Sequence, residues 1–240
     1  MNRRYLMLCT IAVMVVLAGV AEKQLADDTQ VISKVPTTHK VVAITIDDGP
    51  NYKATPEILA VLKAKNVRAT FFVLGQNAEA LPGLVAQEVA DGHEIGAHTY
   101  SHPSLPKLSP QKVADEFEKA EKAITAIAPR PTLFRPPGGF YNSQVTEIAR
   151  QRGYTVVLWS IDPRDWSCPP AANVVDKVLA EIKPGSIILL HDGQYPLPTP
   201  QALGIIIDRL RERGYEFVTV SELFQYNEVR HSFSLANGIF

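Results

Sequence analysis

Cysteine is nearly absent from this chain of 240 residues, which contains only Cys9 and Cys168. Because Cys9 lies in an apolar N-terminal segment, no disulfide is expected inside a folded domain. A small secreted scaffold held together by disulfides is therefore excluded. Cys168 lies between Ser167 and Pro169, and we interpret it as a loop residue rather than a nucleophile.

The sequence also lacks an excess of charge of one sign. The formal net charge is −1, and no basic cluster follows Arg3 and Arg4. Charge therefore gives no reason to expect nucleic acid or an anionic membrane as a partner. No glycine-rich phosphate loop of the GxGxxG or GxxxxGKS type is present. With 46% hydrophobic and 20% charged residues, the composition suits one ordinary globular domain.

The N-terminal segment differs from the rest of the chain. Arg3 and Arg4 precede an uncharged, mostly apolar run from Tyr5 to Ala21, and charge returns at Glu22. This pattern is typical of a secretory signal peptide. The run is slightly shorter than the ~20 residues that span a bilayer, so an uncleaved membrane anchor is the alternative. We expect residues 1–21 to be one of the two, and the protein to be extracytoplasmic, either secreted or anchored at the cell surface.

The remaining chain alternates between strand-like and helical patterns. Residues 22–40 lack periodicity and are interpreted as a linker, whereas residues 41–226 are expected to form one folded domain. Strand-like runs occur at 41–47, 69–75, 93–98, 132–135, 155–161, 186–191 and 216–220. About seven such units predict a parallel sheet in a distorted or incomplete (β/α) barrel. The tail, residues 227–240, has no clear pattern, which leaves open an extra strand against the barrel or a disordered end.

Three predicted helices are preceded by a Ser/Thr-Pro step, which is typical of an N-cap followed by proline in the first turn. The steps are Thr55-Pro56, Ser109-Pro110 and Thr199-Pro200.

Polar side chains gather where the predicted strands end. The first run ends in Asp47 and Asp48, and further polar residues follow later runs: His98 and His102, Arg135, Asp162, Asp165 and Trp166, His191 and Asp192. In a (β/α) barrel these positions share the C-terminal edge of the sheet, where active sites are built. The sequence therefore predicts a functional site at this edge.

Two histidines and one carboxylate in this group form a candidate metal site. His98 and His102 are separated by three residues, and Asp48 supplies a third ligand. Three protein ligands leave positions open for water and substrate, which is typical of a catalytic rather than a structural site. Non-haem iron oxygenases use the same ligand types, so the set alone leaves the chemistry open. A simple turn at Asp48-Gly49-Pro50 is the structural alternative.

Arg135 and His191 complete the candidate site. An arginine at a strand exit can hold a carboxylate through two hydrogen bonds and fix its orientation. His191 lies beside Asp192, and a nearby carboxylate favours the protonated imidazole that donates a proton.

Taken in order, these motifs resemble those of the polysaccharide deacetylase family, carbohydrate esterase family four. The resemblance covers residues 41–224. Its five motifs are Thr45-Ile46-Asp47-Asp48-Gly49, His98-Thr99-Tyr100-Ser101-His102, Arg135-Pro136-Pro137, Asp165-Trp166 and Leu189-Leu190-His191.

The resemblance implies a role for each motif. It implies that Asp48, His98 and His102 bind a divalent metal, usually zinc, with cobalt, nickel or manganese as alternatives. Asp47 would be the base that takes a proton from the metal-bound water, Arg135 would orient Asp47, and His191 would protonate the leaving amine. Asp165 would support His191 or Arg135, and Trp166 and Leu189 would line the pocket for the acetyl methyl group.

One position departs from the family pattern. Members commonly have a tyrosine after the second proline of the third motif, and this chain has Gly138. Pro136 and Pro137 carry no N–H, so Gly138 is the first residue after Arg135 whose backbone can donate to an oxyanion. Any contact between the tyrosine ring and substrate is lost.

We therefore expect an exported, metal-dependent hydrolase that removes N-acetyl groups from the amino sugars of a polysaccharide. Peptidoglycan is the first choice of substrate. The alternatives are N-deacetylation of chitin oligomers or another exopolysaccharide, O-deacetylation of acetylxylan, and a non-catalytic sugar-binding barrel. An iron oxygenase is disfavoured, because an acid and base pair such as Asp47 and His191 has no role there.

Overall fold

The computed structural model describes residues 31–228. The predicted signal peptide or anchor and residues 229–240 of the predicted tail lie outside this range. Within this range, the residues from Ile32 onward belong to one compact unit. No helix within the described residues has the length and apolar character needed to cross a bilayer.

Parallel strands form the centre of the domain. Their order in the sheet is β1-β6-β5-β4-β3-β2-β7, and β8 pairs with the beginning of β2. Every ladder from β2 to β8 is parallel. The strands are β1 (Val31–Ile32), β2 (Val41–Asp47), β3 (Thr70–Val73), β4 (Glu94–Ala97), β5 (Leu133–Phe134), β6 (Thr155–Val157), β7 (Ile187–His191) and β8 (Glu216–Phe217).

The chain that follows β6 brings the two sides of the sheet together. Ile161 forms an isolated parallel bridge with Ile188 of β7. The Leu189 N–H donates to the Ile161 carbonyl oxygen at 2.9 Å, and the Ser160 N–H donates to the Ile187 carbonyl oxygen at 3.0 Å. The predicted fold class, a distorted (β/α) barrel, is confirmed.

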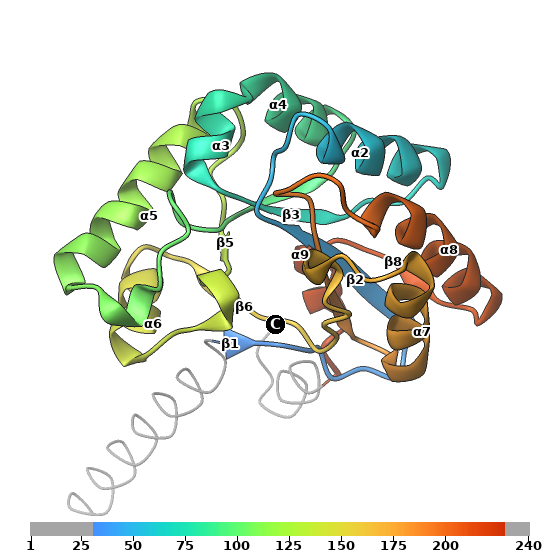
Figure 1. The fold of residues 1–240 in the computed structure, drawn as a ribbon. Helices are drawn as coiled ribbons and strands as arrows, with labels where there is room; N and C mark the ends of the chain where they lie inside the picture. The colour runs from blue at the N-terminus through green and yellow to red at the C-terminus, as the bar shows by residue number, and fades with distance from the viewer. Residues whose placement is uncertain (1–30, 229–240) are drawn as a thin grey trace, which may run out of the picture. The chain divides into compact units, whose positions relative to one another are not determined.

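Helices cover the outside of the strands (Figure 1). The α-helices are α2 (Ala54–Ala64), α3 (Gly75–Ala80), α4 (Pro82–Ala90), α5 (Pro110–Thr125), α6 (Ser143–Gln151), α7 (Ala171–Glu181), α8 (Thr199–Glu212) and α9 (Val220–Leu223). Short 3₁₀ helices are η1 (Leu105–Lys107), η2 (Pro137–Gly139), η3 (Asp165–Ser167) and η4 (Phe224–Tyr226). All seven residues of β2 are buried, because barrel residues pack inside and helices cover the outside. This explains the continuous apolar run before Asp47.

The predicted linker needs a correction at its C-terminal end. Residues 22–40 lack periodicity, yet Val31–Ile32 form β1 and Val35 is only 1% exposed. Lys34 forms an antiparallel bridge with Ser186, just before β7. Residues from 32 onward therefore belong to the folded domain. A strand of two residues is too short to produce a recognisable pattern in the sequence.

The three predicted helix starts have different outcomes. Ser109 is the N-cap of α5, and its hydroxyl accepts from the Lys112 N–H as predicted. The other two predictions are wrong, because α2 begins at Ala54 and α8 begins at Thr199. Thr55 and Thr199 instead use their hydroxyl groups to hold carboxylates, Asp192 and Asp165.

Candidate functional site

The end of β2 presents two carboxylates in different surroundings. Asp47 is the last residue of the strand and is 2% exposed. It lies in register between Phe72 of β3 and His191 of β7. Asp48 follows with a φ of 77°, which turns the chain out of the strand and leaves its side chain partly accessible. The two side chains therefore differ in burial, and their predicted division of roles stays a prediction.

Asp48, His98 and His102 converge as the sequence predicted. Each offers one ligand atom, and these atoms lie within 4.8 Å of one another. The Asp48 Oδ1 atom is 3.3 Å from the Nε2 atom of each histidine. This oxygen is buried and has no hydrogen-bond partner among residues 31–228. A buried carboxylate oxygen without a partner is costly, and a divalent cation would compensate it. The three residues therefore fit a metal ion.

A second interaction orients His98. Its Nδ1 atom is 2.7 Å from the carbonyl oxygen of Arg135. Because a carbonyl oxygen only accepts, Nδ1 carries the proton and donates it. In the neutral ring this leaves the lone pair on Nε2, the atom that faces Asp48. A backbone or carboxylate acceptor behind a histidine is the usual arrangement for a metal ligand.

The loop that carries His102 is fixed by α5. Glu116 accepts hydrogen bonds from the N–H groups of Tyr100 and Ser101, each at 2.9 Å, and from the Ser101 hydroxyl at 2.8 Å. The His102 N–H donates to the Thr99 hydroxyl oxygen at 3.1 Å. These contacts hold the two histidines in position although residues 98–102 form a loop and not a helix.

The protonation states in this cluster also suit a cation. Burial raises the pKa of the Asp48 carboxyl, but His98, His191 and His102 outweigh it and lower the pKa to about 2. Burial and the neighbouring His98 lower the pKa of His102, against the opposing charges of Asp48 and Asp47. At neutral pH the cluster therefore offers an ionised carboxylate and a neutral His102, the forms that bind metal.

Arg135 holds Asp47 as predicted. Its guanidinium is completely buried, and Nη1 donates to the Asp47 Oδ1 atom at 2.6 Å and to the Thr45 hydroxyl at 2.8 Å. The remaining donors reach the carbonyl oxygens of Val157 and Leu158 at 3.1 and 2.9 Å. Since Oδ1 is occupied, Oδ2 is the oxygen of Asp47 nearest the metal cluster, 3.8 Å from the His98 Nε2 atom.

Asp165 holds His191 rather than Arg135, which settles a choice that the sequence left open. The Asp165 Oδ1 atom is 2.7 Å from the His191 Nδ1 atom. Its Oδ2 atom accepts from the backbone N–H of His191 at 2.8 Å and from the Thr199 hydroxyl at 2.6 Å. Asp165 is fully buried, so these contacts fix the plane of the imidazole and leave Nε2 free.

The surroundings of His191 raise its pKa. Burial alone lowers it, but the Asp165 hydrogen bond and charge, together with the charges of Asp47 and Asp48, raise the pKa from 6.5 to about 9. His191 is therefore protonated at neutral pH and is able to act as an acid.

Asp192 lies directly behind the site. It is fully buried and accepts a hydrogen bond from the Thr55 hydroxyl at 2.5 Å. Burial and the charges of Asp48 and Asp47 raise its pKa to about 7, against the Thr55 hydrogen bond and His191. Gly49 is required beside it, because a Cβ atom there would lie 2.3 Å from the Asp192 oxygens.

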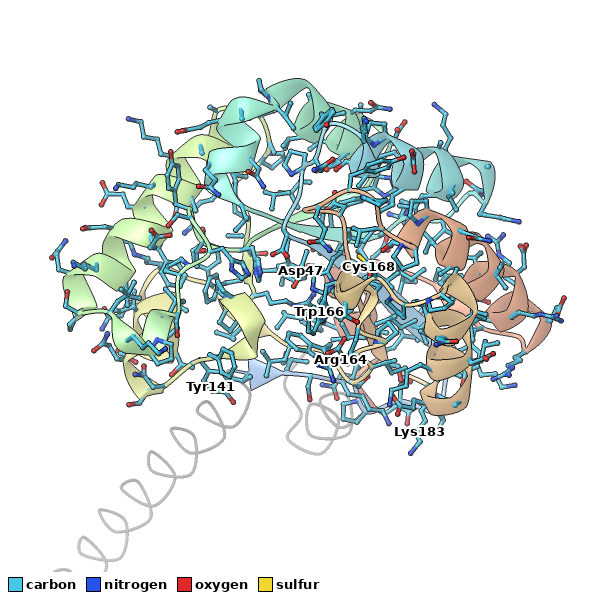
Figure 2. The ribbon with its side chains drawn as sticks, viewed as in Figure 1. Asp47, Tyr141, Arg164, Trp166, Cys168 and Lys183 are labelled. Carbon is cyan, nitrogen blue, oxygen red and sulfur yellow. The ribbon has the colours of Figure 1, made fainter. Side chains whose placement is uncertain are left out.

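A cavity of about 330 Å³ opens beside the candidate metal ligands Asp48 and His102. It is lined by Asp48, Leu74, Gln76, Asn77, His102, Trp166, His191, Gly193 and Gln194. Trp166 is 43% exposed and, with Asp47, is labelled at the open end of the barrel in Figure 2. The predicted pocket residue Leu189 is instead 3% exposed within β7, and neither it nor Gly138 lines this cavity.

Gly138 adopts a conformation that explains its identity. Its φ is +61°, and a Cβ atom there would lie 2.9 Å from the ring of Phe140. The N–H groups of Gly139 and Phe140 donate to the carbonyl oxygens of Pro136 and Pro137. The described residues offer no such partner to the Gly138 N–H. Proline is incompatible with this positive φ, and a tyrosine would be strained.

Sequence reasoning missed several supporting residues. Asn77 donates to the Asp48 carbonyl oxygen at 2.8 Å, and Thr45 and Thr199 hold Arg135 and Asp165. Thr199 carried a misleading signal, since a threonine before proline resembles an N-cap. Asn77 and Gln194 had no local signal, because their partners come from other parts of the chain.

Comparison with known proteins agrees with this geometry. The chain is 41% identical over 207 residues to a peptidoglycan-N-acetylglucosamine deacetylase of Bacillus cereus, covering 85% of this chain and 97% of that protein. It is 39% identical over 196 residues to a chitooligosaccharide deacetylase of Bradyrhizobium, covering 76% of this chain and 90% of that protein.

A solved structure is similar as well. The Bc1960 peptidoglycan N-acetylglucosamine deacetylase matches with a TM-score of 0.81 and 36% identity, over 84% of this chain and 96% of that one. Residues 34–157 match the polysaccharide deacetylase family. With the sequence motifs, the fold and the site in agreement, this chain belongs to the polysaccharide deacetylase family.

Proposed function

We propose that this protein is an exported, metal-dependent N-deacetylase that acts on the amino sugars of peptidoglycan. One observation carries the proposal. The Asp47 carboxylate, oriented by the buried Arg135, lies beside the Asp48, His98 and His102 cluster and next to His191. A base, a metal site and an acid around one cavity are the groups that amide hydrolysis requires.

Asp48, His98 and His102 would hold the cation, for which Zn²⁺ is the first choice and Co²⁺, Ni²⁺ and Mn²⁺ are alternatives. When bound, such a cation would make water a nucleophile near neutral pH and polarise the amide carbonyl. The histidine and carboxylate ligands are consistent with each of these metals.

Asp47 would take the proton from the attacking water. Arg135 occupies its Oδ1 atom, so Oδ2 is directed to the cluster and is available to accept. The guanidinium also makes three further hydrogen bonds, which keep it from rotating away with the carboxylate. Fixed in this way, Asp47 would act as a base rather than as a fourth ligand of the cation.

His191 would protonate the leaving amine through its Nε2 atom. Asp165 holds the Nδ1 side of the ring at 2.7 Å, so only Nε2 is available. The Gly138 N–H, which has no backbone acceptor among the described residues, would stabilise negative charge on the former carbonyl oxygen. Trp166 would contact the substrate from the rim of the cavity.

Peptidoglycan is preferred because proteins of that named activity share 41% and 36% identity with this chain over most of its length. The similarity to a chitooligosaccharide deacetylase supports chitin oligomers as a second candidate. Acetylxylan O-deacetylation and a non-catalytic sugar-binding barrel are the remaining alternatives. The presence of base, acid and three ligands disfavours the last.

Acetate release tests the proposal. Peptidoglycan, chitin oligomers and acetylxylan would be assayed side by side with the purified protein, before and after treatment with a chelator. We expect release from peptidoglycan that the chelator abolishes and added Zn²⁺ or Co²⁺ restores. Full activity in a preparation verified to be free of metal would refute the metal-dependent mechanism, and release from acetylxylan alone would refute N-deacetylation.

Export is the second part of the proposal, and it rests on Arg3, Arg4 and the apolar run to Ala21. Cell fractionation should find the protein in the membrane or outside it. Mass spectrometry of its N-terminus distinguishes a cleaved signal peptide, with a start near Glu22, from an intact anchor. A full-length cytoplasmic protein would contradict export.

A further inference from the structure

Three exposed side chains form a cluster beside the cavity. The Lys53 ammonium lies 5.6 Å from the ring centroid of Tyr52 and 5.0 Å from that of Tyr195. Tyr52 is 66% exposed and Tyr195 46% exposed. We call these residues the Tyr52–Lys53–Tyr195 cluster. Large aromatic side chains that stay in water beside an active site are candidates for ligand contact.

The cluster is joined to the site by two adjacent loops. Tyr52 and Lys53 follow β2, Tyr195 follows β7, and the two strands are neighbours in the sheet. The Asn51 amide donates to the Gly193 carbonyl oxygen at 3.4 Å. The loops approach so closely that a Cβ atom on Gly193 would lie 2.3 Å from the Asp48 Cβ atom. Gly193 and Gln194, directly before Tyr195, line the cavity.

The Lys53 ammonium forms no ion pair within the described part of the chain. No carboxylate of the described residues lies within 4.0 Å of its ammonium, although several other lysines have such partners. As the N-cap of α2 it makes no side-chain hydrogen bond. A cation held over an aromatic ring is stabilised and positioned while it still faces solvent. This arrangement offers a positive charge between two apolar ring faces.

We propose that the Tyr52–Lys53–Tyr195 cluster binds a neighbouring sugar of the same glycan strand, one whose substituent carries a carboxylate. The tyrosine rings would contact the sugar ring, and Lys53 would pair with the carboxylate. This inference rests on the proposed function and deepens it. Peptidoglycan carries carboxylates on the substituent of every second sugar, whereas chitin has none, so the cluster would select between them.

Three variants test the proposal. Lys53→Met removes the charge and keeps most of the apolar stem, and Tyr195→Leu removes one ring. The matched control is Lys183→Met, an exposed lysine in the segment before β7, at the end of that strand opposite His191 (Figure 2). Each protein would be checked for folding and metal content. The substrates are a carboxylate-bearing peptidoglycan oligosaccharide and a neutral chitin oligosaccharide of equal length.

For Lys53→Met we expect kcat/KM on the acidic oligosaccharide to fall about 2- to 5-fold, as for an exposed ion pair, with no change on the neutral one. Added salt should weaken the wild-type preference for the acidic substrate and leave the variant insensitive, because surface charges are screened. Tyr195→Leu should lower both rates up to about 10-fold. Lys183→Met should match the wild type on both substrates.

Equal effects of Lys53→Met on both substrates, or no effect on either, would overturn the inference while leaving N-deacetylation intact. Absence of acetate release from every substrate would instead refute the proposed function. In that case, equilibrium binding of the acidic oligosaccharide to wild-type and Lys53→Met protein still decides the role of the cluster. Equal affinities would overturn it.

Discussion

Replacement of Asp165 by asparagine should shift the pH dependence of catalysis. Asp165 holds the His191 Nδ1 atom at 2.7 Å and contributes to a pKa that rises from 6.5 to about 9. A rise of this size corresponds to roughly 3 kcal/mol in favour of the protonated ring. The amide removes the negative charge, so the His191 pKa should fall towards its ordinary value.

The consequence for activity can be worked out at pH 8. With a pKa of about 9, some 90% of His191 is protonated, whereas a pKa of 6.5 leaves about 3%. If His191 donates the proton to the leaving amine and its pKa falls all the way to 6.5, kcat/KM at pH 8 should fall ~30-fold; the charges of Asp47 and Asp48 remain in the variant and make the loss smaller. The alkaline limb of the profile should move to lower pH. A bound cation would offset the negative charges of Asp47 and Asp48, which also raise the His191 pKa. The quantity to compare is therefore the difference in apparent pKa between the variant and the wild type.

The assay is acetate release between pH 5 and 10 by metal-loaded enzyme. Asp162→Asn is the matched control, since Asp162 lies in the same loop and accepts from the Arg164 N–H at 2.8 Å rather than from His191. Thermal unfolding would confirm that Asp165→Asn is folded. An unchanged alkaline limb in folded, metal-loaded Asp165→Asn enzyme would show that His191 does not supply the proton.

Two further predictions concern the neighbouring aspartates and a buried histidine. Asp48→Ala should lose the metal, whereas Asp47→Asn should retain it and lose ~10²–10⁴-fold in turnover; equal metal loss in both variants, measured by elemental analysis, would contradict this division. His93 accepts from the Ala69 N–H, and burial lowers its pKa to about 4 despite the charge of Asp91. The unfolded chain therefore takes up this proton first, so about 3 kcal/mol of stability present above pH 6.5 should be lost towards pH 4. The free energies of unfolding of wild-type and His93→Gln protein, measured with denaturant, should converge as the pH falls from 6.5 to 4. A constant difference between them would refute this prediction.

Much of the fold could be predicted because buried parallel strands appear in the sequence as short, nearly continuous apolar runs. The seven strand-like runs each contain an observed strand, and β2 matches its run, residues 41–47, in full. The strand β1 could not be found, because two residues have no periodicity and their partners lie elsewhere in the chain. The burial of Val35 could not be predicted either, because it depends on contacts with the segment before β7, which is distant in sequence.

The candidate site was predictable where chemistry is concentrated in motifs, and less so where one residue supports another. Asp48 follows β2 and both histidines follow β4, so the three residues meet at the C-terminal edge of the sheet with only β3 between the two strands. The functions of Thr55 and Thr199 could not be deduced, because a hydroxyl before proline has the same sequence signature whether it caps a helix or binds a distant carboxylate. The left-handed backbone of Gly138 could not be deduced from the sequence either. It makes glycine necessary at this position and makes a proline variant unsuitable as a test.

The pairing of β2 with β7 also determines when the site can form during folding. Asp47 and His191 are adjacent in the sheet although most of the domain separates them in sequence. Contacts of such long sequence separation carry a large loop-closure cost, and they slow folding relative to local contacts. The three predicted metal ligands, by contrast, lie within the first half of the domain. A nascent chain that has not yet added β7 would therefore contain all three proposed metal ligands but not His191, the proposed acid. Metal uptake could then precede the competence to hydrolyse.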